Sequence, residues 1–252
     1  MLRGLDGYYT YWDQVKTLTK EMIYSEWMEP KKSGNRSRAP VLLPKLHGSF
    51  RVSDRLFGED VIFFQRLLKS EGFYPGALDG LWGRVSESAA NAFDIEYEKL
   101  KNQLGTFDRR TEQKISSLSI QAQREARAFM RRALSWGVNV KIISGTRTYH
   151  EQNQLFRQGR YGNPGPVVTR ARGGQSHHNF GIAWDIGIFR RDGSYSTSQS
   201  DYDAVAEYAT GSLVWGGSWR SFPDSPHYQL RTAHTQIAWV RTRFEQGETY
   251  VA

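Results

Sequence analysis

Apolar residues along this 252-residue chain recur with two periods, one of three to four residues and one of two. The longer period is clearest in four residues that would share one face of a helix, namely Val61, Phe64, Leu67 and Leu68. Gly72 follows them as the expected helix C-cap. The same reasoning predicts helices over residues 8–29, 59–71, 85–94, 119–136, 150–158, 201–210 and 232–245. The polar segment 95–118 is predicted to include a linking helix.

Short apolar or alternating runs predict strands. They cover residues 138–143, 166–168, 182–189 and 228–230. Helices and strands follow one another without the regular rhythm of βαβ units, so the sequence predicts an α+β fold with a small antiparallel sheet. No apolar run approaches the length of a membrane span, and we expect none.

The chain divides into three predicted parts. Residues 1–50 contain the first helix, ended by Pro30, and a polar linker over 31–40, and we assign no role to them. Residues 51–100 form a small helical unit, and residues 106–252 form the main domain. The N-terminus lacks the apolar core of a signal peptide, so we expect synthesis in a cytoplasm and another route to any site of action outside it.

The amino-acid composition limits the chemical groups that the protein can use. The chain has no cysteine, which excludes disulfides, thiolate zinc ligands and a cysteine nucleophile. Residues 106–252 carry +7 of the net charge of +8, almost entirely as arginine. This favours an anionic partner, and nucleic acid, an anionic cell-wall polymer and an acidic membrane surface all fit the charge. A solubilising surface charge is the plainer alternative.

Two segments combine histidine and aspartate with turn residues. His178 and Asp185 stand at the two ends of a glycine-containing stretch, and His227 immediately precedes a predicted strand. Two imidazole nitrogens and one carboxylate resemble the ligand sets of catalytic zinc sites, which leave the fourth position to water. Asp224 is three residues before His227, close enough to share a pocket and act as a base. A histidine near a turn is otherwise usually a surface or hydrogen-bonded residue.

These segments resemble the zinc peptidase family of D-alanyl-D-alanine carboxypeptidases and L-alanyl-D-glutamate endopeptidases. The resemblance covers about residues 106–230 and lies in Ser176-x-His178-x-x-Gly181-x-Ala183-x-Asp185 followed by Asp224-x-x-His227. It is closest to the endopeptidase branch found in phage endolysins. The matches to that branch are Ile143-Ser-Gly-Thr-Arg-Thr148, Glu151-Gln152, Leu155, Gln158-Gly159-Arg160, Val168-Thr169, Gly174-Gln-Ser176 and Trp215-Gly-Gly217.

The resemblance implies a role for each matched residue. His178, Asp185 and His227 would bind one Zn²⁺, and Asp224 would be the general base. Arg147 would hold the substrate and stabilise the oxyanion, as its planar donor fork allows. The base is aspartate where some relatives have glutamate, which the endopeptidase branch accepts. His177 is the open point, because it adjoins His178 and could be a substrate contact or merely exposed.

The helical unit resembles a three-helix peptidoglycan-binding module over roughly residues 52–95. The matching positions are Asp60-Val61, Gln65, Leu68, Gly72-Phe73, Asp79-Gly80, Trp82-Gly83, Ser86, Ala89 and Phe93. Ser86 stands where the family usually has threonine, and Asp94 where it often has glutamine. The alternative is a helical cap without a binding role.

The resemblance implies a zinc endopeptidase that hydrolyses the L-alanyl–D-glutamate bond of peptidoglycan stem peptides. The arginine-rich segment from Arg157 to Gln175 would surround the carboxylate-rich peptide. We expect a monomer acting on the cell wall, with no nucleic-acid partner, because no basic helix or aromatic RNA-binding signature is present. Two alternatives remain, namely a D-alanyl-D-alanine carboxypeptidase and a virion-associated lysin. The complete set of His178, Asp185, Asp224 and His227 argues against a wall-binding protein with a decayed catalytic domain.

Overall fold

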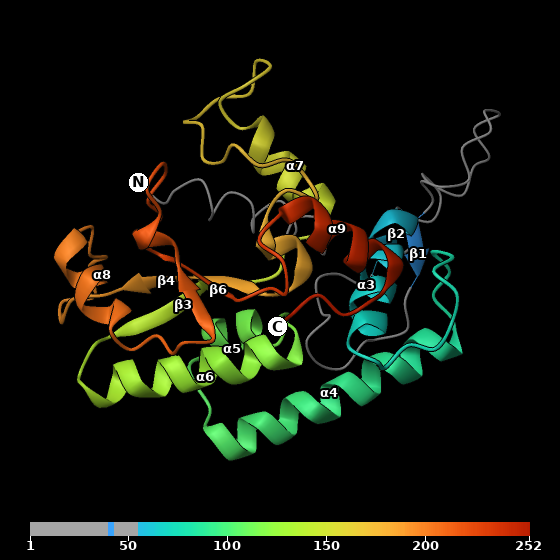
Figure 1. Cartoon of the computed structure of the whole chain (residues 1–252), viewed down its shortest axis with the longest axis horizontal. Helices are drawn as coiled ribbons and strands as arrows, with labels where there is room; N and C mark the ends of the chain where they lie inside the picture. The colour runs from blue at the N-terminus through green and yellow to red at the C-terminus, as the bar shows by residue number, and fades with distance from the viewer. Residues whose placement is uncertain (1–39, 43–54) are drawn as a thin grey trace.

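The computed structural model describes residues 40–42 and 55–252, so the helix predicted over 8–29 lies outside the described residues. The described helices are α3 (Gly58–Ser70), α4 (Arg84–Leu104), α5 (Arg109–Ile115), α6 (Ile120–Ser135), α7 (Tyr149–Arg157), α8 (Gln199–Ala206) and α9 (Ile237–Gln246), with the short 3-10 helices η2 (His177–Phe180) and η3 (Gly216–Ser218). The described strands are β1 (Pro40–Leu42), β2 (Arg55–Phe57), β3 (Val140–Ser144), β4 (Ala183–Ile188), β5 (Leu213–Trp215) and β6 (His227–Leu230). The predicted α+β class is confirmed (Figure 1).

A four-stranded sheet forms the centre of the C-terminal part. Its order is β3-β4-β6-β5, and each neighbouring pair is antiparallel, as the sequence predicts. The register of β4 and β6 places Asp185 directly opposite His227. The strand pairing therefore brings together two residues that are 42 positions apart in the sequence.

The two faces of the sheet have different roles. Successive side chains of a strand point to opposite faces. Trp184 and Tyr228, paired across β4 and β6, face helix α6, where the Tyr228 ring packs on Phe129 at a centroid distance of 4.6 Å. Asp185 and His227 consequently point to the opposite face. The apolar face packs against α6, and the opposite face presents the polar side chains Asp185 and His227.

Several predicted helix boundaries differ from the structure, including that of the helix predicted over 201–210, which is α8 over Gln199–Ala206. The helix predicted over 85–94 continues as α4 to Leu104, because Tyr97 and Leu100 extend its buried face. No glycine or proline interrupts it before Gly105, whose φ of 99° ends the helix. The linking helix expected within 95–118 is α5, which begins after Asp108 with that carboxylate accepting from two helix N–H groups.

The strand predicted over 166–168 is wrong, because residues 158–175 contain no strand. Val167 and Val168 are about half exposed and pair with no neighbouring strand. Pro166 lacks a backbone N–H, so it cannot donate to a ladder. The helix predicted over 232–245 starts later, at Ile237, because Thr232 pairs with Val251 in an isolated bridge.

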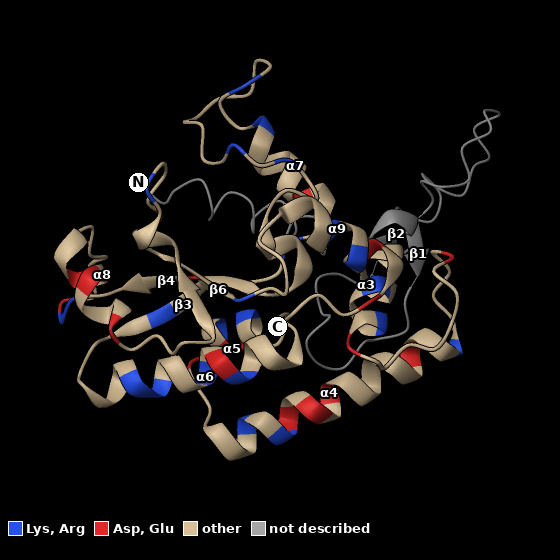
Figure 2. Cartoon of the chain, viewed as in Figure 1, with Lys and Arg blue, Asp and Glu red and all other residues tan. Residues whose placement is uncertain are grey.

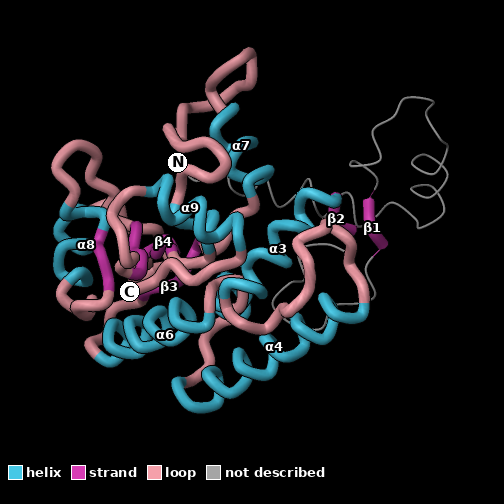
Figure 3. Tube along the Cα trace, turned by 45° about the vertical axis from the view of Figure 1, so that its right-hand side comes forward, coloured by secondary structure: helices cyan, strands magenta, loops and turns pink. Residues whose placement is uncertain are grey.

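Helix α3 packs directly on the C-terminal part of the chain (Figures 1 and 3). The ring of Phe63 lies 5.3 Å from that of Phe244 in α9. The carboxylate of Glu71, just after α3, accepts a hydrogen bond of 2.8 Å from the backbone N–H of Ile120 at the start of α6. Buried residues of α3, α4, α6, the sheet and α9 belong to one hydrophobic cluster. The small helical unit and the main domain thus share a core in the described residues.

The positive charge is not gathered on one side of the fold. Figure 2 shows lysine and arginine on α6 below the sheet and on the segment that follows α7 at the top of the view. Within the part of the chain that the structure describes, no helix is both long and apolar enough to cross a membrane.

Candidate metal centre

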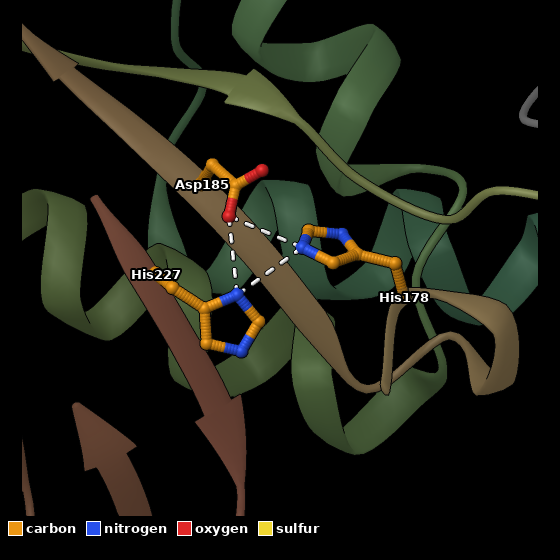
Figure 4. A group of neighbouring side chains, drawn as sticks. All are labelled: His178, Asp185 and His227. Carbon is orange, nitrogen blue, oxygen red and sulfur yellow. Dashed lines mark hydrogen bonds and ion pairs between the residues drawn. The ribbon is translucent and has the colours of Figure 1, made fainter. Parts of the chain in front are cut away.

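Three side chains predicted as metal ligands meet on the polar face of the sheet (Figure 4). His178 Nε2 lies 3.1 Å from Asp185 Oδ1 and 3.2 Å from His227 Nδ1, and the last two atoms are 3.2 Å apart. The three atoms therefore form a nearly equilateral triangle. Both histidines are buried, and Asp185 is partly exposed.

The backbone explains why these side chains converge. Asp185 and His227 are opposite each other on β4 and β6, on the face away from α6. His178 comes from η2, which leads into β4 through Gly181. Gly181 has a φ of 69°, a conformation that glycine adopts readily, and this sharp turn carries the chain from η2 back onto the sheet.

A second set of hydrogen bonds orients the two imidazoles. The other nitrogen of His178, Nδ1, lies 2.8 Å from the carbonyl oxygen of Gly145, and Nε2 of His227 lies 3.0 Å from Oε1 of Gln229. Both partners accept, so each of these ring nitrogens carries the proton. The nitrogens that face the triangle are then free to bind a cation.

Gln229 is a functional candidate that the sequence reasoning missed. A detectable signal exists, because Gln229 is two residues after His227 in a strand and therefore shares its face.

Charge states in the triangle suit metal binding. Burial, together with the nearby Arg147 cation, lowers the pKa of His178 to about 4, so His178 is neutral at neutral pH. Burial opposes ionisation of Asp185, but hydrogen bonds and charge from the two histidines outweigh it and hold the pKa of Asp185 well below its usual range. Burial disfavours protonation of His227, yet Asp185 and Gln229 raise its pKa overall. A bound cation would take the place of that proton.

Arg147 lies beside the triangle. Its Nη2 is 3.7 Å from Asp185 Oδ2, on the carboxylate oxygen that does not face the histidines. Its backbone N–H donates to the carbonyl of His178 at 3.0 Å. The structure therefore brings Arg147 to the same site as the three ligand candidates.

Asp224 reaches the site from the loop before β6. Its backbone carbonyl accepts from His227 N–H at 3.1 Å, and its own N–H donates to Gly216 O at 3.0 Å. Burial and the negative charge of Asp185 raise the pKa of Asp224, against the opposing influence of His227 and Arg147. Asp224 is not one of the three residues whose ligand atoms converge.

Gly216 permits this close approach. A Cβ atom at that position would lie 2.5 Å from Asp224 O and 2.9 Å from His227 Cβ. Trp215, the residue before it, donates from its indole N–H to Ser225 O at 2.8 Å and fixes the other end of the loop. Trp215 and Gly216 thus help to hold Asp224 next to β6.

Two aromatic residues complete the surroundings of the triangle. The ring of Trp219 lies 5.1 Å from that of His227. Burial and the charges of His227 and His178 lower the pKa of His177 to about 3, which places this residue electrostatically near the centre. His177 itself is not among the converging ligand residues.

The arginine-rich segment that follows α7 is held by specific contacts. Arg160 donates to Thr169 O at 3.0 Å, and its guanidinium lies 4.3 Å from the ring centroid of Phe156. Further along, the Arg170 guanidinium lies 5.2 Å from the ring of Phe222, two residues before Asp224. This cation–π contact links the segment to the loop that carries Asp224.

The donor set fits a zinc ion. Zinc binds imidazole nitrogen and carboxylate oxygen at about 2.0–2.2 Å in tetrahedral geometry, which separates neighbouring ligand atoms by about 3.3 Å. The observed separations of 3.1 to 3.2 Å match this triangle. Three protein ligands leave one tetrahedral position open, as in catalytic rather than structural zinc sites.

Sequence comparison identifies the class of protein that this site defines. A profile of the D-alanyl-D-alanine carboxypeptidase family matches residues 169–230, which include His178, Asp185, Asp224 and His227. The chain is 39% identical over 118 residues to the peptidoglycan L-alanyl-D-glutamate endopeptidase CwlK of Bacillus subtilis (strain 168), a match that covers 43% of this chain and 70% of the relative. The chain belongs to this family of metallopeptidases.

Two solved structures are similar to part of the chain. The L-Ala D-Glu endopeptidase ChiX of Serratia marcescens aligns with a TM-score of 0.40 and 24% identity, covering 49% of this chain and 88% of that one. VanYB in complex with D-alanine-D-alanine aligns with a TM-score of 0.34 and 19% identity, covering 52% of this chain and 79% of that one. The family assignment rests on the sequence matches, since both structural scores are below 0.5.

Proposed function

We propose that this protein is a zinc endopeptidase that hydrolyses the L-alanyl–D-glutamate bond of peptidoglycan stem peptides. The observation that carries the proposal is the convergence of His178, Asp185 and His227, with Arg147 and Asp224 beside them. The identity to CwlK supports the choice of bond.

Each residue has a task in this reaction. A bound Zn²⁺ would polarise the scissile carbonyl and lower the pKa of water. Asp224 accepts a proton on its carboxylate from the attacking water and delivers it to the leaving nitrogen. The Arg147 guanidinium donates to the oxygen on which negative charge develops. Asp185 Oδ2, 3.7 Å from Arg147 Nη2, holds that guanidinium next to the reacting carbonyl.

Product analysis tests the proposal. Purified peptidoglycan is digested with the protein, and the new termini are identified by mass spectrometry. New L-alanine carboxyl ends and D-glutamate amino ends are expected. Release of free D-alanine without these ends would instead support the D-alanyl-D-alanine carboxypeptidase alternative, which the name of the matching family motivates.

The proposal includes one zinc ion per monomeric chain. Among the described residues, one group of converging candidate ligands was found, His178, Asp185 and His227, which supports this stoichiometry. Metal analysis of the purified protein together with light scattering should give one equivalent of zinc and the mass of one chain. Two chains per particle, or no bound zinc, would contradict this part.

We further propose that residues 51–100 bind the cell wall. Two apolar side chains in and after the glycine-rich turn support this, because Leu81 is 69% exposed and Val85 is 49% exposed. In the inactive Asp224→Asn background, the full chain should pellet with cell-wall sacculi, and Leu81→Ser with Val85→Ser should weaken pelleting. The matched control is Ile95→Ser on α4, which is similarly exposed. Equal pelleting by all variants would contradict the proposed binding role and favour a structural cap.

The biological setting we propose is host lysis by a phage endolysin. The motifs that resemble the endopeptidase branch of phage endolysins support it, and a virion-associated lysin is the alternative. An antibody against the chain should detect it in lysates of infected cells but not in purified virions. Detection in virions would favour the alternative.

A further inference from the structure

Asn179, the residue after the ligand candidate His178, is completely buried. Its Oδ1 accepts a hydrogen bond of 3.0 Å from the N–H of Gly174. Its Nδ2 donates to the carbonyl of Arg147 at 2.9 Å and to that of Thr148 at 3.4 Å. All three partners fit one orientation of the Asn179 amide, because the Gly174 N–H is a donor and the carbonyls of Arg147 and Thr148 are acceptors.

These bonds hold the backbone of Arg147 on both sides. The Arg147 N–H donates to the carbonyl of His178, and the Arg147 carbonyl accepts from the side chain of Asn179. Arg147 precedes Thr148, the N-cap of α7, so its carbonyl is outside the hydrogen bonding of that helix. Two consecutive residues of η2 therefore fix the backbone from which the guanidinium extends.

The hydrogen bond from Gly174 connects a further segment of the chain to the Asn179 side chain. Gly174 is buried and lies at the end of the arginine-rich segment that leads into η2. An apolar side chain in place of Asn179 would leave one N–H and at least one carbonyl buried without this partner, at a cost of about 1–3 kcal/mol each. The Asn179 amide is thus buried where three segments meet, namely η2, the residues before α7 and the end of the arginine-rich segment, and its hydrogen bonds connect them.

We propose that Asn179 is a positioning residue that holds Arg147 in register with the metal ligands. The inference rests on the proposed role of Arg147 in the peptidase reaction. Asn179 does not touch the substrate. It affects catalysis by holding the Arg147 guanidinium in its position 3.7 Å from Asp185.

The test uses Asn179→Asp in the full chain, because this change keeps the shape and the bond from Gly174 but turns an oxygen toward two carbonyls. We expect one zinc per chain to remain and kcat/KM on stem peptide to fall about 10- to 100-fold, the usual effect of outer-shell residues. In an Arg147→Ala background the same change should lower kcat/KM by less than about threefold, because coupled residues are not additive. Asn179→Ala provides a second variant if the aspartate folds poorly.

The matched control is Gln123→Glu on α6. Gln123 is also a completely buried amide, and its Nε2 donates to Leu118 O at 2.9 Å without contact to Arg147. Once corrected for folded fraction, this variant should keep the kcat/KM of the unmodified protein. A similar loss in the control would mean that any buried amide matters, and would overturn the proposal.

Three further outcomes also contradict it, namely full activity of Asn179→Asp, an equal loss in both Arg147 backgrounds, and loss of zinc. Amide hydrogen exchange on the metal-free protein gives a readout independent of activity. Exchange at Arg147 should be faster in Asn179→Asp than in the unmodified protein, and unchanged exchange would overturn the proposal. An unmodified protein that cleaves no stem peptide would refute the proposed function, while the exchange experiment would still decide the role of Asn179.

Discussion

The two candidate ligand histidines present different ring nitrogens to the centre, Nε2 from His178 and Nδ1 from His227. The difference follows from their hydrogen bonds, because Gly145 O accepts from Nδ1–H of His178 and Gln229 Oε1 accepts from Nε2–H of His227. Each residue outside the triangle thus selects the tautomer of a residue inside it. The tautomers at the centre therefore depend on residues outside the triangle of candidate ligands.

The first prediction separates the proposed base from the ligands. Asp224→Asn should keep one equivalent of zinc but lose activity by at least about 100-fold, because the amide cannot accept a proton from water. His227→Ala should lose the zinc itself, since it removes one of three ligands. Metal analysis and peptidoglycan digestion measure the two effects. Full activity of Asp224→Asn would exclude Asp224 as the base.

The second prediction concerns Gln229. Gln229→Leu should weaken zinc affinity about 10- to 100-fold, because the His227 ring loses the acceptor that orients it. Competition with a chelator measures the affinity. Gln199→Leu is a suitable control, since Gln199 accepts from Ser225 Oγ rather than from a ligand. Equal affinities in both variants would show that Gln229 is not needed.

At the scale of elements, a buried ion pair joins three helices. Arg127 of α6 donates from Nη2 to Glu112 of α5 at 2.7 Å, and its Nη1 donates to Gly105 O at the end of α4. Tyr97 of α4 also donates to Glu112, at 2.8 Å. Arg127 is completely buried, so this pair sets how α4, α5 and α6 meet.

The third prediction follows from that pair. Burial opposes ionisation of Glu112, but hydrogen bonds from Arg127, Phe107 N–H and Tyr97 outweigh it and lower the pKa of Glu112. The pair therefore stabilises the fold fully above the ordinary glutamate range and loses this contribution as pH falls through the lowered pKa. Glu112→Gln should reduce the free energy of unfolding by about 3–5 kcal/mol at neutral pH, because it leaves Arg127 without its counter-ion.

Urea unfolding as a function of pH measures this effect. The difference between Glu112→Gln and the unmodified protein should shrink in acid, where Glu112 becomes protonated in both states. Glu98→Gln is the control, because the Glu98 side chain is 54% exposed and pairs with Lys101 at the surface. A difference independent of pH would contradict the role given to the ion pair.

At the scale of the whole molecule, the helical unit and the peptidase part share one core. Phe63 of α3 packs on Phe244 and on Tyr149, with ring centroids 5.3 and 6.0 Å apart. Tyr149 is the first residue of α7, two positions after Arg147. The N-terminal helices therefore support the elements from which the site is built.

The fourth prediction tests this coupling. Phe63→Ala should lower the free energy of unfolding by about 3–5 kcal/mol, because it removes a fully packed aromatic ring. Calorimetry should show a single transition that moves to lower temperature as one unit. Ile95→Ala, a change at a 58% exposed residue of α4, should have little effect. Two separate transitions would show that residues 51–100 and 106–252 unfold as independent domains.

Secondary structure was predictable where the apolar pattern was strong. Helix α6 and strands β4 and β6 lie within two residues of their predicted ends, because the apolar residues of their buried faces form a clear pattern along the sequence. The predicted strand at 166–168 failed because a strand requires a partner, which a local pattern cannot supply. Strand β5 (Leu213–Trp215) was not among the predicted strands.

The amino-acid sequence alone sets which candidate metal-binding and proton-transfer groups the chain contains. With no cysteine and with His178, Asp185, Asp224 and His227 in turn-rich motifs, the donor types and their order along the chain were already set. The geometry of these groups depends on the fold. Pairing of β4 with β6 places Asp185 against His227, and η2 ties Arg147 to His178. Spacing along a chain reports local periodicity, whereas a catalytic site depends on contacts between segments that only folding brings together.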